Sequence, residues 1–224
     1  LDHLTIARSR RHIERYYGTS ETGRFPDRLP PINIKADVDR AGEFRSIRDI
    51  NLEIRRLNLA AYAPLRYVLP HRQEAYDQKY STQIRGGESF FRQVDREESL
   101  IHLLRVNVLK RMESAVSSFA LTVHRQQKDV EAVLAQISAH PAEIEELDIT
   151  DVDVEDPTFE SLLVGRKVKV LLSDVDLVRW KQDLIEDRNR LATLLAAAQQ
   201  VDAVRDAKLA KLREMIEQKC LQPI

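Results

Sequence analysis

The chain has 224 residues, of which 43% are hydrophobic and 32% charged, so it can form one large domain or two small ones. The net charge of −1 predicts no general attraction to nucleic acid or to an anionic membrane. A single cysteine, Cys220, excludes a disulfide framework and favours a reducing, cytoplasmic compartment, and the short apolar runs exclude a transmembrane helix. Because the chain begins at Leu1 and shows no signal-peptide pattern, we expect an excerpt from a longer polypeptide.

A helical pattern in residues 4–16 opens the chain and carries three arginines, Arg8, Arg10 and Arg11. These arginines indicate either a solvated start of a helix or a cluster that contacts phosphate, because a guanidinium offers a planar fork of donors. Glycine and prolines then predict a loop over residues 19–31. Residues 32–38 alternate apolar and polar side chains, which predicts a strand that must pair with another segment.

Helical spacing returns at residues 44–63, and Pro64 predicts the end of that helix or a kink. A second, polar helix is expected over residues 71–80, followed by a loop at 81–89. The tyrosines of this region favour packing in a core over stacking on nucleic-acid bases, since aromatic residues at helical spacing usually face a core. They are Tyr62, Tyr67, Tyr76 and Tyr80.

Residues 96–139 form the longest amphipathic pattern of the chain. Apolar residues recur there at steps of three, four or seven, and neither proline nor glycine interrupts them before Pro141. A single helix of this length would extend over roughly 65 Å. We therefore expect one strut, which begins with Asp95 and Glu98 as a capping pair and carries Lys110 and Arg111. The apolar stripe consists of Ile101, Leu104, Val108, Met112, Ala115, Phe119, Val123, Val130, Leu134 and Ile137.

Residues 143–156 hold eight acidic and no basic residues, which is typical of a solvated acidic loop. A calcium loop is excluded there because the required glycine and terminal glutamate are missing. Residues 164–172 predict a strand or a small hairpin, and Ser173 is expected to cap the next helix. Apolar spacing predicts that this helix runs from Leu177 to Ala198. A break near 201–204 and a last helix over 206–219 should follow.

The sequence shows no pattern that carries catalysis. Glycine-rich phosphate loops, metal-ligand spacing among the six histidines and a serine or cysteine nucleophile motif are all missing. We therefore assign no catalytic residue, no metal ligand and no cofactor to this chain.

Three stretches, in the right order, resemble Swi/Snf-type ATP-dependent helicases, and the large bacterial members most of all. Residues 4–13 (LTIARSRRHI) resemble the segment that leaves the first RecA-like lobe after motif III, and the expected strand at 32–38 fits the strand that follows it. Residues 103–124 (LLRVNVLKRMESAVSSFALTVH) are similar to the "LLKRLESS…F…T" helix of the insertion between the lobes. Residues 206–217 (DAKLAKLREMIE) look like the "D.K...L...I" helix before the second lobe.

The resemblance implies that the parent protein couples hydrolysis of ATP, with magnesium, to movement on double-stranded DNA. Residues 1–43 would leave the first lobe, residues 44–219 would form the helical inter-lobe domain, and residues 220–224 would begin the linker to the second lobe. The fold expected is mainly α, with long antiparallel helices and one or two short strand pieces. The ATP site would lie outside this chain. The residues of this chain that contact DNA would be Arg8, Arg10, Arg11, Lys110 and Arg111.

Two other interpretations stay open. The chain could be a non-enzymatic helical scaffold or oligomerisation module, or a DNA-binding module that acts by itself. Flanking sequence with a nucleotide-phosphate loop would separate the helicase interpretation from the scaffold. Apolar faces that meet the lobes in the parent would also allow the isolated chain to dimerise.

Overall fold

The structure is a computed structural model that describes residues 9–17, 23, 25, 30–80, 82–83, 90–139, 163–165 and 168–221. The chain divides after Lys35 into two compact units. In the first unit, the described residues include helix α1 (Arg10–Tyr17), which has no buried residue. The N-terminal part of the helix expected at 4–16 lies outside the described residues, as does the acidic stretch 143–156.

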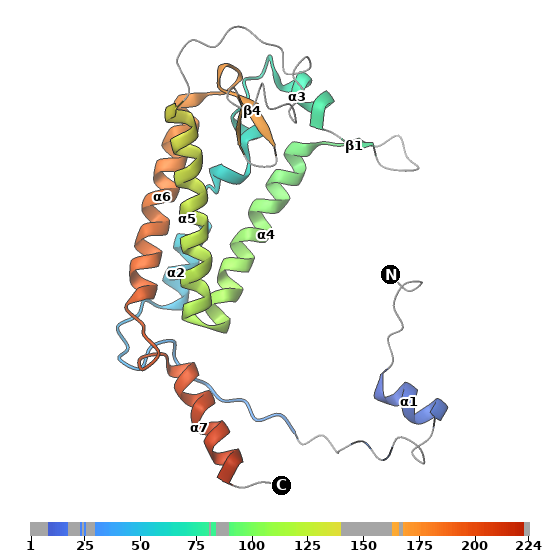
Figure 1. Ribbon diagram of the computed structural model, residues 1–224, viewed down its shortest axis with the longest axis vertical. Coiled ribbons are helices and arrows are strands. Elements are labelled where there is room, and N and C mark those ends of the chain that lie inside the picture. Colours follow the sequence, from blue (N-terminus) through green and yellow to red (C-terminus); the bar gives the residue numbers. More distant parts are fainter. Residues whose placement is uncertain are drawn as a thin grey trace. The chain divides into compact units, whose positions relative to one another are not determined.

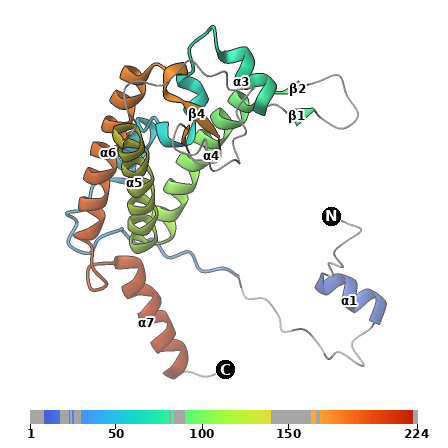
Figure 2. The ribbon, with the colours of Figure 1, turned by 45° about the horizontal axis from the view of Figure 1, so that its top comes forward.

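Three long helices build the second unit: α4 (Gln93–Ser114), α5 (Val116–Ala139) and α6 (Leu177–Gln199). Helix α5 packs against both of the others, and neighbouring helices run in opposite directions (Figure 1). Figure 2 shows α5 and α6 still side by side when the molecule is turned. The prediction of a mainly α fold with long antiparallel helices is confirmed.

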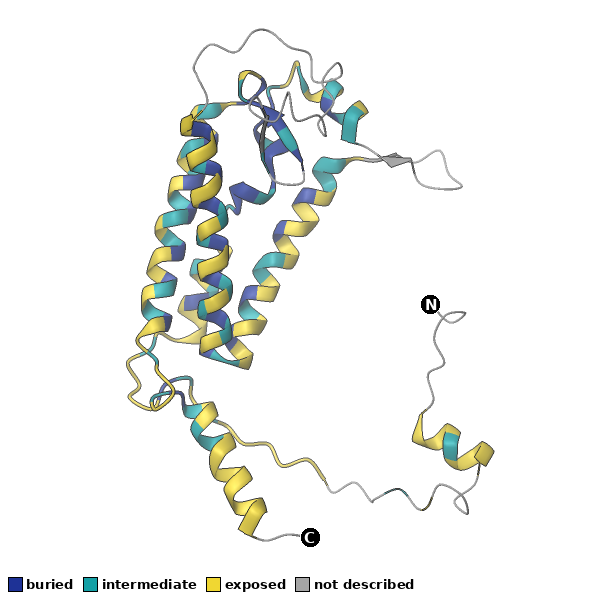
Figure 3. Ribbon diagram, in the orientation of Figure 1, coloured by how far each residue is buried: buried dark blue, intermediate teal, exposed yellow. Residues whose placement is uncertain are grey.

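The predicted apolar stripes form the core of this unit, and Figure 3 shows the buried faces of the three helices turned toward one another. Phe119 and Val123 of α5 are fully buried, and so is Trp180 of α6, as expected for a core anchor. Tyr67 and Tyr76 are also buried, which confirms the packing role predicted for them. No helix in the described part of the chain is both long enough and apolar enough to cross a membrane.

The single strut predicted over residues 96–139 is wrong. Ala115 has extended backbone angles (φ −157°, ψ 140°), ends α4 and separates it from α5. The two helices fold back on each other as a hairpin, and the apolar stripe continues through the turn because both helices face the same core. The break falls inside the stretch 103–124 that carries the family resemblance.

Helix α2 (Ile47–Arg55) is much shorter than the helix predicted over 44–63. Ser46 caps its start by accepting the N–H of Asp49 at 3.1 Å. The chain then leaves helical geometry, since Leu59 takes a left-handed conformation with φ 54°. Two short 3₁₀ helices follow, η1 (Ala60–Tyr62) and η2 (Pro64–Tyr67), and then α3 (Gln73–Tyr80).

The strands of the described chain form short antiparallel pairs. Strand β1 (Thr82–Gln83) pairs with β2 (Phe90–Phe91), at the edges of the stretch predicted as a loop. Strand β3 (Leu163–Gly165) pairs with β4 (Lys169–Leu171), which confirms the predicted hairpin, and η5 (Leu172–Asp174) follows it. Gly165 has φ 136°, and a Cβ there would collide with the carbonyl oxygen of Val168.

Both predicted caps are wrong by a few residues. Arg92 precedes the first turn of α4, so Asp95 lies inside the helix rather than at its cap. Asp176, not Ser173, caps α6 by accepting the N–H of Arg179 at 3.1 Å.

The strand predicted over 32–38 is also wrong, since those residues form no ladder and Ile32 is 85% exposed. Pairing is limited to one antiparallel bridge between Asp39 and Asp206. Residues 38–40 and 205–207 thereby lie side by side, and we call them the clasp. The N–H of Arg40 donates to the carbonyl of Arg205 at 2.8 Å, and the N–H of Ala207 donates to that of Val38 at 3.3 Å.

The side chains of the clasp add a second set of bonds. Asp39, which is 4% exposed, receives the guanidinium of Arg205 through both carboxylate oxygens. It also accepts the backbone N–H groups of Ala41, Glu43 and Phe44 at 3.0–3.1 Å. Arg205 holds the pKa of Asp39 well below its usual range. Helix α7 (Ala207–Leu221) begins directly after the clasp, and none of its residues is buried.

Candidate functional site

Residues 57–68 form a buried segment that passes between the long helices without regular α structure. Its short helix η1 contacts α4, α5 and α6. Leu57, Leu59 and Leu65 are at most 2% exposed, so the polar backbone of this segment lies away from water. Buried backbone N–H and C=O groups need partners, and here side chains of distant helices supply several of them.

Two carboxyl groups accept the N–H groups of this segment. Asp187 of α6 accepts the N–H of Asn58 at 2.6 Å and that of Ala60 at 2.8 Å. Glu97 of α4 accepts the N–H of Leu65 at 3.1 Å. Carboxyl groups from two different long helices thus fix an irregular backbone in the core.

Two donors satisfy carbonyl groups of the same segment. Arg105 donates from Nη2 and Nε to the carbonyl of Leu57, at 2.6 and 3.2 Å. The indole of Trp180 donates to the carbonyl of Ala60 at 3.1 Å. The segment is therefore held on both its donor and acceptor sides.

Burial changes the protonation of these carboxyl groups. It raises the pKa of Glu97 to about 8, against the opposing effects of the Leu65 N–H and of Arg66. It raises the pKa of Asp187 to about 6. Oε1 of Glu97 has no hydrogen-bond partner among the described residues, so this group is the least satisfied of the buried network.

Tyrosine hydroxyls tie the segment and α3 to their neighbours. Tyr67 donates to Asp183 at 2.7 Å, and Tyr76 donates to Asp174 at 2.9 Å. Tyr76 also accepts the N–H of Leu171 at 3.0 Å, which links α3 to β4. Burial raises the pKa of both hydroxyls, so both remain protonated donors near neutral pH.

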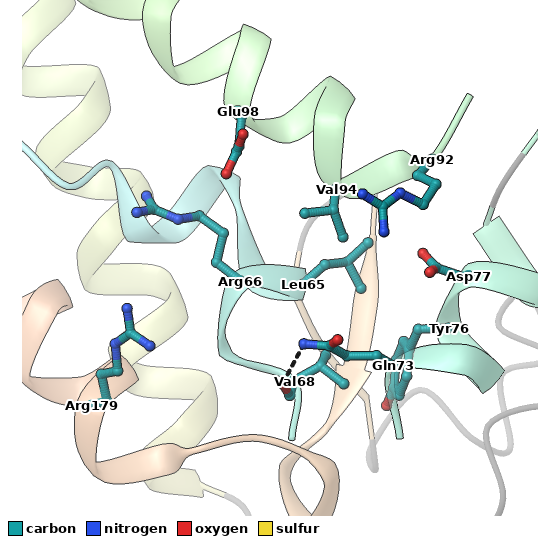
Figure 4. Close-up of a pocket in the computed structure, with 10 residues that line it drawn as sticks. All are labelled: Leu65, Arg66, Val68, Gln73, Tyr76, Asp77, Arg92, Val94, Glu98 and Arg179. Atoms are coloured by element: carbon teal, nitrogen blue, oxygen red, sulfur yellow. Dashed lines mark hydrogen bonds between the residues drawn. The ribbon is translucent and has the colours of Figure 1, made fainter. Parts of the chain in front are cut away.

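A pocket of about 320 Å³ opens beside the buried segment and is the candidate binding site (Figure 4). Its apolar floor comes from η2 and the start of α4, and charged side chains surround it. The lining residues are Leu65, Arg66, Val68, Gln73, Tyr76, Asp77, Arg92, Val94, Glu98 and Arg179.

The three arginines of the pocket differ in their partners. Arg92 lies 3.6 Å from the carboxylate of Asp95. Arg179 lies over the ring of Tyr67, 5.7 Å from its centre. Among the residues that the structure describes, neither Arg66 nor Arg179 has a carboxylate within ion-pair distance. Two guanidinium groups are thus left to face this pocket unneutralised.

The sequence-predicted site residues are divided between the two units of the chain. Arg10 and Arg11 lie exposed on α1 in the first unit, and Arg10 lies 5.5 Å from the ring centre of Phe25. Lys110 and Arg111 lie exposed near the end of α4 in the second unit. Arg8 lies outside the described residues. Contact of these residues with DNA therefore stays a prediction.

Arg66 and Arg179 were not predicted, because they belong to segments far apart in the sequence. Arg66 falls between apolar residues of a stretch with no helical or strand pattern, and Arg179 belongs to the polar face of an amphipathic helix. No local signal marks either of them, and only the packing of η2 against α6 joins them.

Within the described chain, no group of three or more histidine, cysteine, aspartate or glutamate side chains is placed to hold a metal ion. Comparison with known proteins found no matching family model, no significantly similar curated protein and no significantly similar solved structure.

Proposed function

We propose that this chain is the helical region between the two RecA-like lobes of a Swi/Snf-type, DNA-dependent ATPase. The proposal rests on the three family-like stretches, at residues 4–13, 103–124 and 206–217, which follow one another in the family's order. The nucleotide site, with its ATP and magnesium, would belong to the parent protein outside these residues.

The clasp is the structural observation that supports this proposal best. A domain inserted into a host protein needs its entry and exit close together, so that the host can fold around them. Here residues 38–40, just before the helices of the unit, pair with residues 205–207, at the start of its last helix. The long helices project from this paired base as one body.

The break at Ala115 changes the mechanical part of the proposal. A single stiff rod can no longer be the lever that joins two lobes, because the family-like stretch turns back on itself. A hairpin packed on α6 can still pass on motion, since its helices share a close-packed core with the buried segment 57–68. Motion would enter and leave through the clasp.

A helical scaffold or oligomerisation module is the second candidate, and one observation is compatible with it. Helix α7 has three exposed apolar side chains at helical spacing: Leu209 is 46% exposed, Leu212 54% and Ile216 54%. Such a stripe would suit a partner helix. It would equally suit a motor lobe, so it does not separate the two candidates.

Flanking sequence and ATPase activity of the parent protein test the proposal. We expect a nucleotide-phosphate loop upstream of residue 1 and ATP hydrolysis that duplex DNA stimulates. Substitution of Asp39 by Asn should lower the stimulation by DNA, because the clasp would no longer hold the two segments together. Substitution of Arg213 by Gln, which breaks an exposed Arg213–Glu217 pair on α7, is the matched control.

Unrelated flanks and a parent without ATPase activity would contradict the helicase proposal. If the chain then formed oligomers in a concentration-dependent manner, and Leu212→Ser abolished them, the scaffold would be the better interpretation.

A further inference from the structure

Arg66 is a half-buried cation without a counterion among the described residues. Other partly buried arginines of the second unit have a partner: Arg72 lies 3.2 Å from Asp174, Arg190 lies 3.2 Å from Glu53, and Arg105 donates to the carbonyl of Leu57. Removing a charge from water is costly unless another charge or a hydrogen-bonding group compensates for it. Arg66 therefore marks a place where an anion would be stabilising.

Arg179, an exposed residue of α6, presents a second guanidinium to the same pocket. It lies over the ring of Tyr67, which stacks on Trp180 with ring centres 5.8 Å apart. The hydroxyl of Tyr67 is held by Asp183, so the ring cannot turn away. Figure 4 shows the side chains of Arg66 and Arg179 on the same side of the pocket.

The positive charge near Arg66 is larger than the pocket lining alone indicates. Arg105 is a further cation close to Arg66. Burial lowers the pKa of the Arg105 guanidinium most, and the positive charge of Arg66 lowers it further. Two carboxylates oppose this charge within the lining: Asp77, which Figure 4 shows on the side of Arg92, and Glu98, which it shows on the side of Arg66. An anion that binds beside Arg66 would therefore be repelled by the carboxylate of Glu98.

We propose that Arg66 and Arg179 bind a backbone phosphate of duplex DNA at this pocket. Guanidinium groups suit phosphate oxygens because they offer planar pairs of donors and stay charged at every physiological pH. Arg92, at the other end of the pocket, supplies a further cation for the same backbone. The choice of DNA as the source of the phosphate rests on the proposed function, whereas the anion site rests on the pocket itself.

Binding of a fluorescent DNA duplex to the full 224-residue chain tests this site. Fluorescence anisotropy would give the affinity between about 50 and 200 mM salt, where phosphate contacts weaken most visibly. Arg66→Gln and Arg179→Gln should each weaken binding several-fold and reduce the slope of log affinity against log salt by about one. Glu98→Gln should strengthen binding, because it removes the opposing charge.

Arg125→Gln is the matched control, since it removes one exposed positive charge from α5 outside the pocket. Arg66→Lys and Arg179→Lys keep the charge and should restore part of the affinity. If Arg66→Gln does not fold by circular dichroism, Arg179→Gln and Glu98→Gln still decide the result. Neither substitution removes a side-chain hydrogen bond within the described chain.

Three results would overturn the site. The chain could fail to bind DNA at low salt, the arginine variants could bind no more weakly than Arg125→Gln, or Glu98→Gln could weaken binding. Arginine-dependent binding of a polyglutamate peptide without binding of DNA would assign the pocket to an acidic protein instead. None of these results would remove an ATPase motif from the flanks of the parent, so failure of the pocket and failure of the proposed function are distinguishable.

Discussion

Asp187 is the residue on which the buried segment depends most directly. Its two carboxylate oxygens accept the N–H groups of Asn58 and Ala60, and the side chain is fully buried. A segment that makes a left-handed turn at Leu59 cannot satisfy these donors by helical bonds. The carboxylate of Asp187 on α6 therefore accepts N–H groups that backbone carbonyls would accept in a regular helix.

Substitution of Asp187 by Ala should destabilise the chain by about 2–5 kcal/mol, since it leaves two buried donors without acceptors. Urea unfolding followed by circular dichroism measures the change. Glu186→Ala, one residue earlier on the same helix, should change the free energy of unfolding by less than about 0.5 kcal/mol. Equal effects of the two substitutions would show that the carboxylate does not hold the segment.

Glu97 should make stability depend on pH. Its pKa is about 8 in the folded chain and close to the ordinary 4.5 in the unfolded chain. Folding therefore takes up a proton between these values, and the free energy of unfolding should fall as pH rises from about 4.5 to about 8. Asp187 contributes in the same direction only up to its own pKa of about 6. The loss between pH 6 and pH 8 is thus assigned to Glu97.

Glu97→Gln should remove most of that loss, because a neutral side chain cannot ionise. We expect the variant to unfold like the unsubstituted chain near pH 4 and to be more stable than it at pH 8, by on the order of 2 kcal/mol. Urea titrations at several pH values give both curves. Glu98→Gln, its exposed neighbour, is the control, and an unchanged loss of stability in Glu97→Gln would contradict the assignment.

At the scale of elements, the turn at Ala115 decides how the chain is arranged. A continuous helix would place residues 102 and 128 about 39 Å apart, at about 1.5 Å per residue. A hairpin with its turn midway between them brings them to the same level and much closer. His102 and Lys128 are exposed, and Cys220 is the only cysteine of the chain, so the two geometries can be distinguished by labelling.

Spin labels on His102→Cys and Lys128→Cys, with Cys220→Ser, should therefore report a distance clearly below 39 Å in pulsed electron resonance. A distance distribution centred near 39 Å would show a straight helix and exclude the hairpin. Cysteines at Lys110 and Lys128, both exposed, offer a second pair across the same turn.

The helices themselves could be predicted from the sequence, and their ends and connections could not. Apolar spacing identified the buried faces of α4, α5 and α6, since the period of a helix is a local property. The turn at Ala115 has no proline or glycine to signal it, and the stripe keeps its period across the break. The helix expected over 44–63 ends early because Glu97 and Asp187, distant in the sequence, stabilise an irregular backbone.

The candidate pocket could not be predicted for the same reason. Sequence patterns favoured clusters of adjacent cations, such as Arg10 with Arg11 and Lys110 with Arg111. Those cations lie on exposed helix surfaces. The unpaired guanidinium groups of Arg66 and Arg179 meet only through tertiary packing, and a local pattern carries no information about it.

At the scale of the whole second unit, the clasp joins the segment before α2 to the segment before α7. Asp39 concentrates the bonds, because one buried carboxylate accepts Arg205 and three backbone N–H groups. Across the clasp, Arg205 makes the links: its guanidinium also lies 2.9 Å from the carboxylate of Glu43, and its carbonyl accepts the N–H of Arg40. Val38 of the clasp and Phe44 beside it pack against the core but are only partly buried, so loss of the clasp should free the connections and leave the fully buried part of the core intact.

Asp39→Asn tests this separation of clasp and core. Asparagine keeps the shape but loses the charge that pairs with Arg205, so amide hydrogen exchange at Arg40, Phe44 and Ala207 should become markedly faster. Exchange at buried Phe119 and Leu191 should stay as slow as before. Acid should mimic the substitution, because a carboxyl group whose pKa is lowered on folding stabilises the fold above its ordinary pKa and loses that effect as pH falls through the folded value. If the amides of the long helices also exchanged faster in Asp39→Asn, the clasp would be part of the core, and a hinge between the helical unit and the lobes that we propose to flank it could not lie there.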